Sequence, residues 1–94
     1  MLNPSSDTNL RQRVIDELIR QNLLKSYGLK PGDDISDDLL LETVLIHADF
    51  PELTALKDLF TPDKIESKIF FLLSRYPQFV IELSVARYVL LQRP

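Results

Sequence analysis

Apolar residues recur at helical spacing along most of the chain, and no segment shows the strict alternation of a β-strand. Two neighbouring rows near the N-terminus are Leu10, Val14 and Leu18, and Ile15, Ile19 and Leu23. Ser6 or Asp7 is the expected N-cap of this first helix, because either side chain can accept a hydrogen bond from a free backbone amide. Gly28 is its expected end, since glycine readily adopts the left-handed conformation that closes a helix.

A second helix is predicted to begin after Ser36, with Asp37 and Asp38 in a first turn whose dipole favours anions. Its apolar residues, between positions 39 and 46, point in nearly every direction. A helix that is apolar on most sides is either central to its bundle or shared with a partner. Pro51 ends this pattern and is expected in the first turn of the next helix.

Three further helices complete the pattern. A short third helix has the stripe Leu53, Leu56, Leu59 and Phe60. The fourth begins at Thr61-Pro62, with Ile65, Ile69, Leu72 and Tyr76 as its main stripe, and is expected to end at Pro77. The fifth is predicted from about Pro77 to Gln92, with the row Phe79, Leu83, Ala86 and Leu90. Together these patterns predict an all-α fold, a single compact bundle of about five helices over residues 1–94 with a flexible N-terminus at residues 1–6.

Composition weighs against catalysis. The chain has no cysteine, one histidine and two glycines, so thiolate chemistry and a glycine-rich phosphate loop are excluded. His47 is expected to be an ordinary polar residue at a helix edge. Counted from Asp33, the sixth position of a calcium loop is Asp38 and the twelfth is Val44, so the required glycine and glutamate are missing. We expect no enzyme activity, no metal, no cofactor and no small-molecule substrate.

The N-terminus lacks the basic and apolar regions of a signal peptide. The longest apolar run, Ile69 to Leu73, has five residues, against the roughly 20 that a membrane span needs. A cytoplasmic location without membrane association is therefore expected.

Charge is distributed unevenly. Residues 31–56 contain seven acids and no lysine or arginine, whereas residues 1–30 and 57–94 each carry a net charge of +2. An acidic block repels nucleic acid and attracts basic protein surfaces. The expected partner is thus a basic protein, bound by the acidic cluster Asp33, Asp34, Asp37, Asp38 and Glu42. Helix capping is the competing explanation for these acids.

A small helix-turn-helix DNA-binding regulator is the alternative function, with the second helix as the recognition helix. That helix carries Asp37, Asp38 and Glu42 without a cation, so it would lose most of the affinity for phosphate. We therefore expect no nucleic acid partner.

The last two helices carry more apolar residues than one stripe can bury. Phe70 and Phe71 lie about 140° and 240° from Ile65 on a helical wheel. Contiguous exposed apolar surface usually marks an interface. Self-association as a homodimer is predicted through Phe70, Phe71, Ile81 and Tyr88. In the alternative, the last two helices form the centre of the bundle and the other three cover them.

The stretch from Leu45 to Phe60, followed by Lys64-Ile65, resembles a class of small all-helical bacterial proteins encoded beside nucleotidyltransferase toxins and thought to act as antitoxin-like partners. The shared pattern is Asp49-Phe50 after a helix, then Leu53, Leu56 and Phe60, then Lys64-Ile65. The resemblance implies a partner-binding role without catalytic residues. The combined prediction is a non-enzymatic protein-binding module, antitoxin-like or accessory, that uses its acidic central surface and self-associates.

Overall fold

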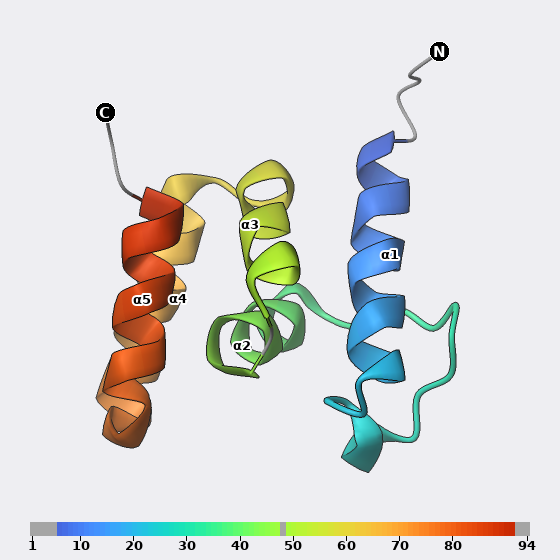
Figure 1. The fold of residues 1–94 in the computed structure, drawn as a ribbon, viewed down its shortest axis with the longest axis horizontal. Coiled ribbons are helices and arrows are strands. Elements are labelled where there is room, and N and C mark those ends of the chain that lie inside the picture. The colour runs from blue at the N-terminus through green and yellow to red at the C-terminus, as the bar shows by residue number, and fades with distance from the viewer. Residues whose placement is uncertain (1–5, 48, 92–94) are drawn as a thin grey trace.

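The computed structural model describes residues 6–47 and 49–91, which form five α-helices and two short 3₁₀ helices without any strand (Figure 1). The α-helices are α1 Ser6–Arg20, α2 Asp37–His47, α3 Phe50–Leu59, α4 Pro62–Arg75 and α5 Val80–Leu91. The 3₁₀ helices are η1 Lys25–Tyr27 and η2 Pro77–Phe79. The all-α prediction is therefore confirmed for the described residues.

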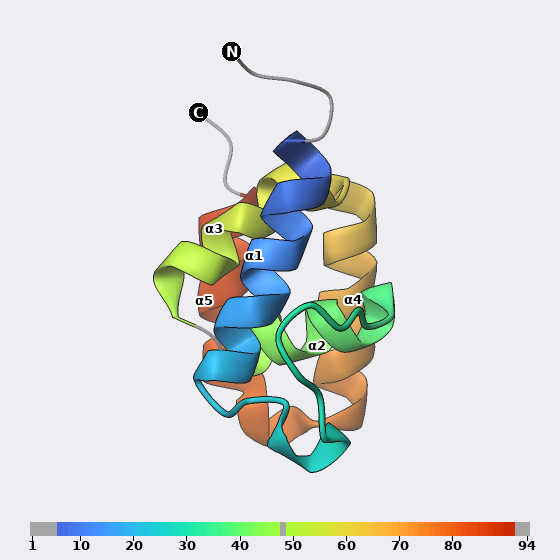
Figure 2. The same cartoon turned by 90° about the vertical axis from the view of Figure 1, so that its right-hand side faces the viewer.

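The helices form a flat slab. Its principal extents are 36 × 35 × 19 Å, so it is about two helix diameters thick. Helix α2 runs across the other four and lies between α1 on one side and the α4–α5 hairpin on the other (Figures 1 and 2). Helices α4 and α5 lie side by side and antiparallel at one edge of the slab, joined by η2.

Helix α2 is the centre of the core. Its buried residues are Leu40, Leu41, Thr43, Val44, Leu45 and Ile46. The neighbouring helices each turn one stripe towards it: Val14, Ile15 and Leu18 from α1, Ile65, Ile69 and Leu72 from α4, and Leu83, Ala86 and Leu90 from α5. This arrangement confirms the central position that the pattern of α2 allowed. The alternative with α4 and α5 at the centre is wrong, because both helices leave their outer sides uncovered.

The first helix ends earlier than predicted. Helix α1 stops at Arg20, because Asn22 adopts the left-handed conformation with φ of 64°. The backbone amide of Asn22 donates to the carbonyl of Ile19 (3.0 Å), and that of Leu23 donates to the carbonyl of Leu18 (3.0 Å). These two bonds form a Schellman motif with asparagine in place of the more usual glycine. Gly28, with φ of 64°, closes the short helix η1 instead.

The other predicted boundaries lie close to the observed ones. Ser36 Oγ accepts a hydrogen bond from the amide of Leu39 (3.1 Å), and Thr61 Oγ1 accepts one from the amide of Lys64 (3.2 Å). Pro77 ends α4 as expected, although it opens η2 rather than α5. Of the predicted flexible N-terminus, residues 1–5 lie outside the described residues, and Ser6 is already the first residue of α1.

Candidate functional site

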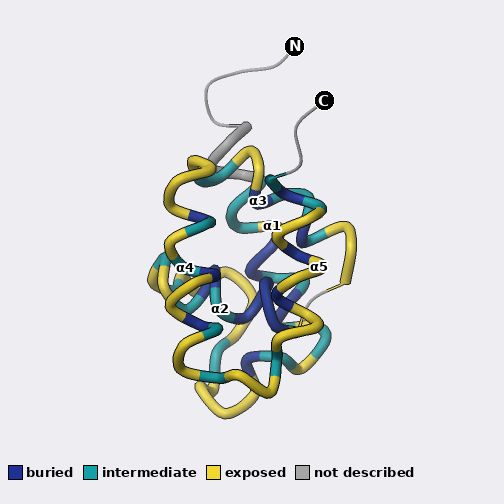
Figure 3. The backbone as a smooth tube through the Cα atoms, turned by 90° about the vertical axis from the view of Figure 1, so that its left-hand side faces the viewer, coloured by how far each residue is buried: buried dark blue, intermediate teal, exposed yellow. Residues whose placement is uncertain are grey.

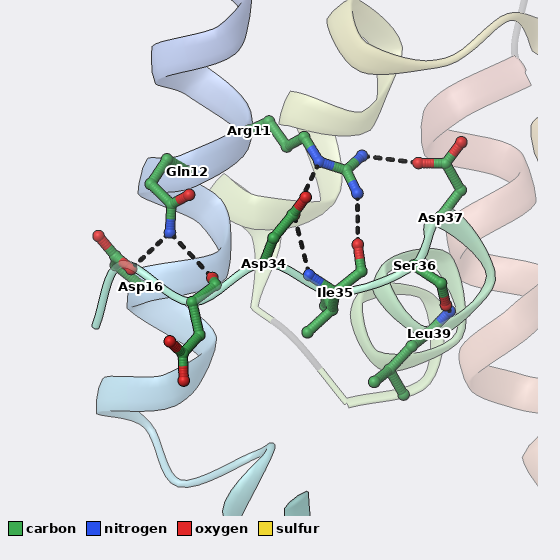
Figure 4. Close-up of polar contacts among 9 residues, drawn as sticks. Arg11, Gln12, Asp16, Asp34, Ile35, Ser36, Asp37 and Leu39 are labelled. Carbon is green, nitrogen blue, oxygen red and sulfur yellow. Dashed lines mark hydrogen bonds and ion pairs between the residues drawn. The ribbon is translucent and has the colours of Figure 1, made fainter. Parts of the chain in front are cut away.

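The acidic cluster lies against α1 and makes contacts within the chain. The guanidinium of Arg11 bonds to Asp34 Oδ1 through Nε (3.3 Å) and to Asp37 Oδ1 through Nη1 (2.7 Å). It also donates from Nη2 to the backbone carbonyl of Ile35 (2.6 Å). Figure 4 shows this one side chain spanning the segment that leads into α2. The Arg11 side chain is only 25% exposed, so these are partly shielded interactions.

A second set of contacts fixes the preceding turn. Gln12 Nε2 donates to Asp16 Oδ1 (3.0 Å) and to the carbonyl of Asp33 (3.1 Å) (Figure 4). Asp16 Oδ1 also accepts from the backbone amide of Gly32 (2.9 Å), and this bond, assisted by Gln12, lowers the pKa of Asp16. Asp33 Oδ2 accepts from the amide of Lys30 (2.9 Å) within the same turn. Asp33 is therefore exposed at the surface and also stabilises this turn.

Helix α4 supplies two more cations to the acidic cluster. Lys64 Nζ lies 3.3 Å from Asp37 Oδ2, and Lys68 Nζ lies 3.6 Å from Asp38 Oδ1. The hydrogen bond from Arg11 is the main cause that lowers the pKa of Asp37. Desolvation opposes it, and the hydrogen bond from Lys64 adds to the lowering. Asp34, Asp37 and Asp38 thus have basic partners within the chain. Glu42 lies further along α2 and is half-buried.

The self-association candidates are exposed side chains of α4 and α5. Exposed fractions are 54% for Phe70 and 50% for Phe71 on α4, and 73% for Ile81 and 65% for Tyr88 on α5. Two residues absent from the predicted set, Val80 and Val85, are also about half exposed on α5. We call these six residues the outer α4–α5 face. Figure 3 looks onto this edge, where exposed stretches run along both helices.

Charged side chains contact the phenylalanines of the outer α4–α5 face. Arg87 pairs with Glu66 across the two helices (3.0 Å), and its guanidinium lies 5.6 Å from the centre of the Phe70 ring. On the other side of α4, Lys68 Nζ lies 4.9 Å from the centre of the Phe71 ring. These distances are within the range of cation–π interactions. The cations lie over the rings, and about half of each phenylalanine remains exposed.

Phe71 also contributes to a shallow groove between α2 and α4. The groove has a volume of about 300 Å³, and its lining includes Asp38, Leu41, Lys64 and Lys68. Both lysines pair with aspartates of the acidic cluster. The groove is therefore lined by both apolar and charged side chains, and its two lysines already form ion pairs within the chain.

Residues that could bind a metal do not cluster in the described part of the chain. His47 is exposed at the end of α2, and its ring meets Phe79 edge-on at 5.8 Å between centroids. Among residues 6–47 and 49–91, no group of three or more histidine, aspartate or glutamate residues could hold a metal ion. In the same part of the chain, no helix has both the length and the apolar character to cross a bilayer.

The helix-turn-helix alternative gains no support from the observed connections. The segment between α1 and α2 spans residues 21–36, which is far longer than the usual turn of about three or four residues. Asp37 and Asp38 in the first turn of α2 pair with lysines of α4. These contacts hold the first turn of α2 against the rest of the domain.

Arg11 is the residue whose role sequence reasoning missed. It binds acids 23 and 26 positions away. No local motif marks a contact of this range. Comparisons of the chain with protein-family models, with curated proteins and with solved structures give no match.

Proposed function

We propose that this chain is a non-enzymatic protein-interaction module and that it associates through the outer α4–α5 face, with self-association as the expected form. The observation that carries the proposal is the exposure of six large apolar side chains on two adjacent helices. Large exposed apolar patches on a small domain usually mark sites of protein interaction. Leaving them in water also forfeits hydrophobic stabilisation that a small domain can rarely spare.

The acidic cluster is the weaker candidate for docking. A basic partner would compete with Arg11, Lys64 and Lys68 for the same carboxylates. Exposed ion pairs contribute little on their own, so each exchange would gain little net free energy. The antitoxin-like role towards a basic partner remains a prediction from the resemblance, and these contacts favour a structural use of the acids.

The test is the molar mass in solution. Size-exclusion chromatography with light scattering should give about twice the chain mass of 10.9 kDa at high protein concentration. Ile81→Lys and Tyr88→Lys should each yield a folded monomer, because burying an unpaired charge in the interface is costly. Tyr27→Lys is the matched control, since Tyr27 is 58% exposed but lies on η1. A native protein that remains monomeric at every concentration would contradict self-association.

A further inference from the structure

We infer that the occupant of the outer α4–α5 face is a second copy of this chain, with the two α5 helices packed antiparallel about a two-fold axis between Ser84 and Val85. The inference rests on the function proposed above and adds the register of the partner. Ile81, Val85 and Tyr88 form a stripe on α5 and are 73%, 52% and 65% exposed.

These three residues lie at i, i+4 and i+7, so they fall within about 60° of one another on a helical wheel. The buried residues of α5, Leu83, Ala86 and Leu90, occupy the opposite side. Within the stripe the one polar side chain is that of Ser84, which is small and exposed. An uncharged stripe with a small residue near its middle permits close approach of a second helix.

The register follows from symmetry. If the axis passes between positions 84 and 85, Ile81 lies opposite the partner's Tyr88, and Tyr88 lies opposite the partner's Ile81. Val85 then lies beside the partner's Val85 across the axis. Every large side chain of the stripe thereby meets an apolar counterpart, as a self-complementary interface requires.

The antiparallel direction follows from the position of α4. A two-fold axis perpendicular to α5 brings the outer sides of both α4 helices opposite one another, so Phe70, which lies on the α5 side of α4, is covered as well. A parallel pair of α5 helices would place the two α4 helices on opposite flanks and leave Phe70 in water. Helix α4 also exposes Ser67 and Ser74 on this side, which suits the polar rim of an interface rather than its centre.

The available area agrees with a dimer. An aromatic side chain presents about 150–250 Å² and an aliphatic one somewhat less, so the five side chains of the face other than Phe71, each exposed by half or more, offer on the order of 500 Å². A stable interface buries about 800 Å² per partner, of which about 57% is apolar, or roughly 450 Å². The outer α4–α5 face therefore supplies an interface core of the right size. Arg87 lies between the two helices of the face and is paired with Glu66 at 3.0 Å, which limits repulsion between the two copies.

Cross-linking tests the register directly. The native chain has no cysteine, so each variant V85C, I81C, Y88C and Y27C carries a single thiol. A short bis-maleimide joins two thiols by forming one thioether at each end, and it can span helix axes that lie about 8–10 Å apart. V85C should give a covalent dimer in high yield. An equimolar mixture of I81C and Y88C should cross-link more strongly than either variant alone.

Y27C is the control, because Tyr27 is comparably exposed but lies on η1, away from the outer α4–α5 face. Its yield measures collisional cross-linking. If the native protein is dimeric by light scattering but V85C reacts no more than Y27C, the register is wrong and the proposed function survives. If the native protein is monomeric and all variants match Y27C, both are wrong.

Discussion

Arg11 and Asp37 are 26 positions apart in the sequence, yet Nη1 of one lies 2.7 Å from Oδ1 of the other. This contact ties the middle of α1 to the first residue of α2. The same guanidinium also binds Asp34 and the carbonyl of Ile35, so it holds the end of the long α1–α2 connection in place. Part of the acidic block thus has a structural use in joining the helices.

Replacing Arg11 with alanine should lower the free energy of unfolding by about 1 kcal/mol. The Arg11 side chain makes charge-assisted hydrogen bonds and is partly shielded from solvent. Its contribution to stability should therefore lie between the small contribution of an exposed ion pair and the larger one of a buried pair. Urea denaturation of R11A measures the loss. Arg13→Ala is the control, because Arg13 is exposed on the same helix. Equal midpoints for the two variants would show that the Arg11 contacts do not stabilise the fold.

Acid should destabilise the protein over a defined range. In the folded state, hydrogen bonds from Arg20 and Gln21 lower the pKa of Glu17 from 4.5 to about 2. Hydrogen bonds also lower the pKa values of Asp16 and Asp37 below the ordinary value of 3.8. The unfolded state therefore binds protons first as the pH falls. The stabilisation is complete above the unfolded pKa values and is lost between about pH 4.5 and about pH 2.

Urea midpoints across this pH range measure the effect. The variant E17Q should show a shallower decline than the native protein, because it lacks the most strongly shifted carboxylate. A decline of the same steepness in E17Q would contradict the assignment to Glu17.

The early end of α1 gives a test at Asn22. This residue has φ of 64°, which glycine adopts without strain and alanine does not. Asn22→Ala should lower the unfolding free energy by about 1 kcal/mol, whereas Asn22→Gly should be neutral or stabilising. Thermal unfolding by circular dichroism compares the two. If both variants melt together, Asn22 does not hold a left-handed conformation in solution.

The N-cap of α2 gives another test. Ser36→Ala removes the hydroxyl that accepts from the amide of Leu39 and should cost about 1 kcal/mol. Ser67→Ala is the matched control, because Ser67 is a solvent-exposed residue in the middle of α4, where alanine is the better helix former. The thermal midpoint should fall for S36A and stay level or rise for S67A. The reverse order would overturn the assignment of Ser36 as the cap.

Most of the fold could be predicted from local signals. Ser36, Thr61 and Pro77 mark helix boundaries through their own chemistry. The apolar character of α2 on most sides left open a central place in the bundle or an interface with a partner, and the structure places the helix at the centre. The end of α1 was misplaced because Gly28 is the more common residue in a left-handed cap. Asn22 can adopt the same conformation but gives a weaker signal in the sequence.

The candidate site was predictable only in part. Phe70 and Phe71 are adjacent on one helix, so their divergence from the core stripe follows from helical geometry alone. The partners of Asp37 could not be foreseen, because Arg11 and Lys64 lie 26 and 27 positions away and are brought there by the packing of α1 and α4. Contacts of this range depend on tertiary structure rather than on spacing.

The most direct test of association through the outer α4–α5 face is a dilution series followed by backbone amide NMR. Amide shifts should change with concentration in α4 and α5, most strongly around Phe70, Ile81, Val85 and Tyr88, and should stay constant around Asp34 and Tyr27. Concentration-dependent shifts centred on the acidic cluster, or none at any concentration, would contradict association through this face.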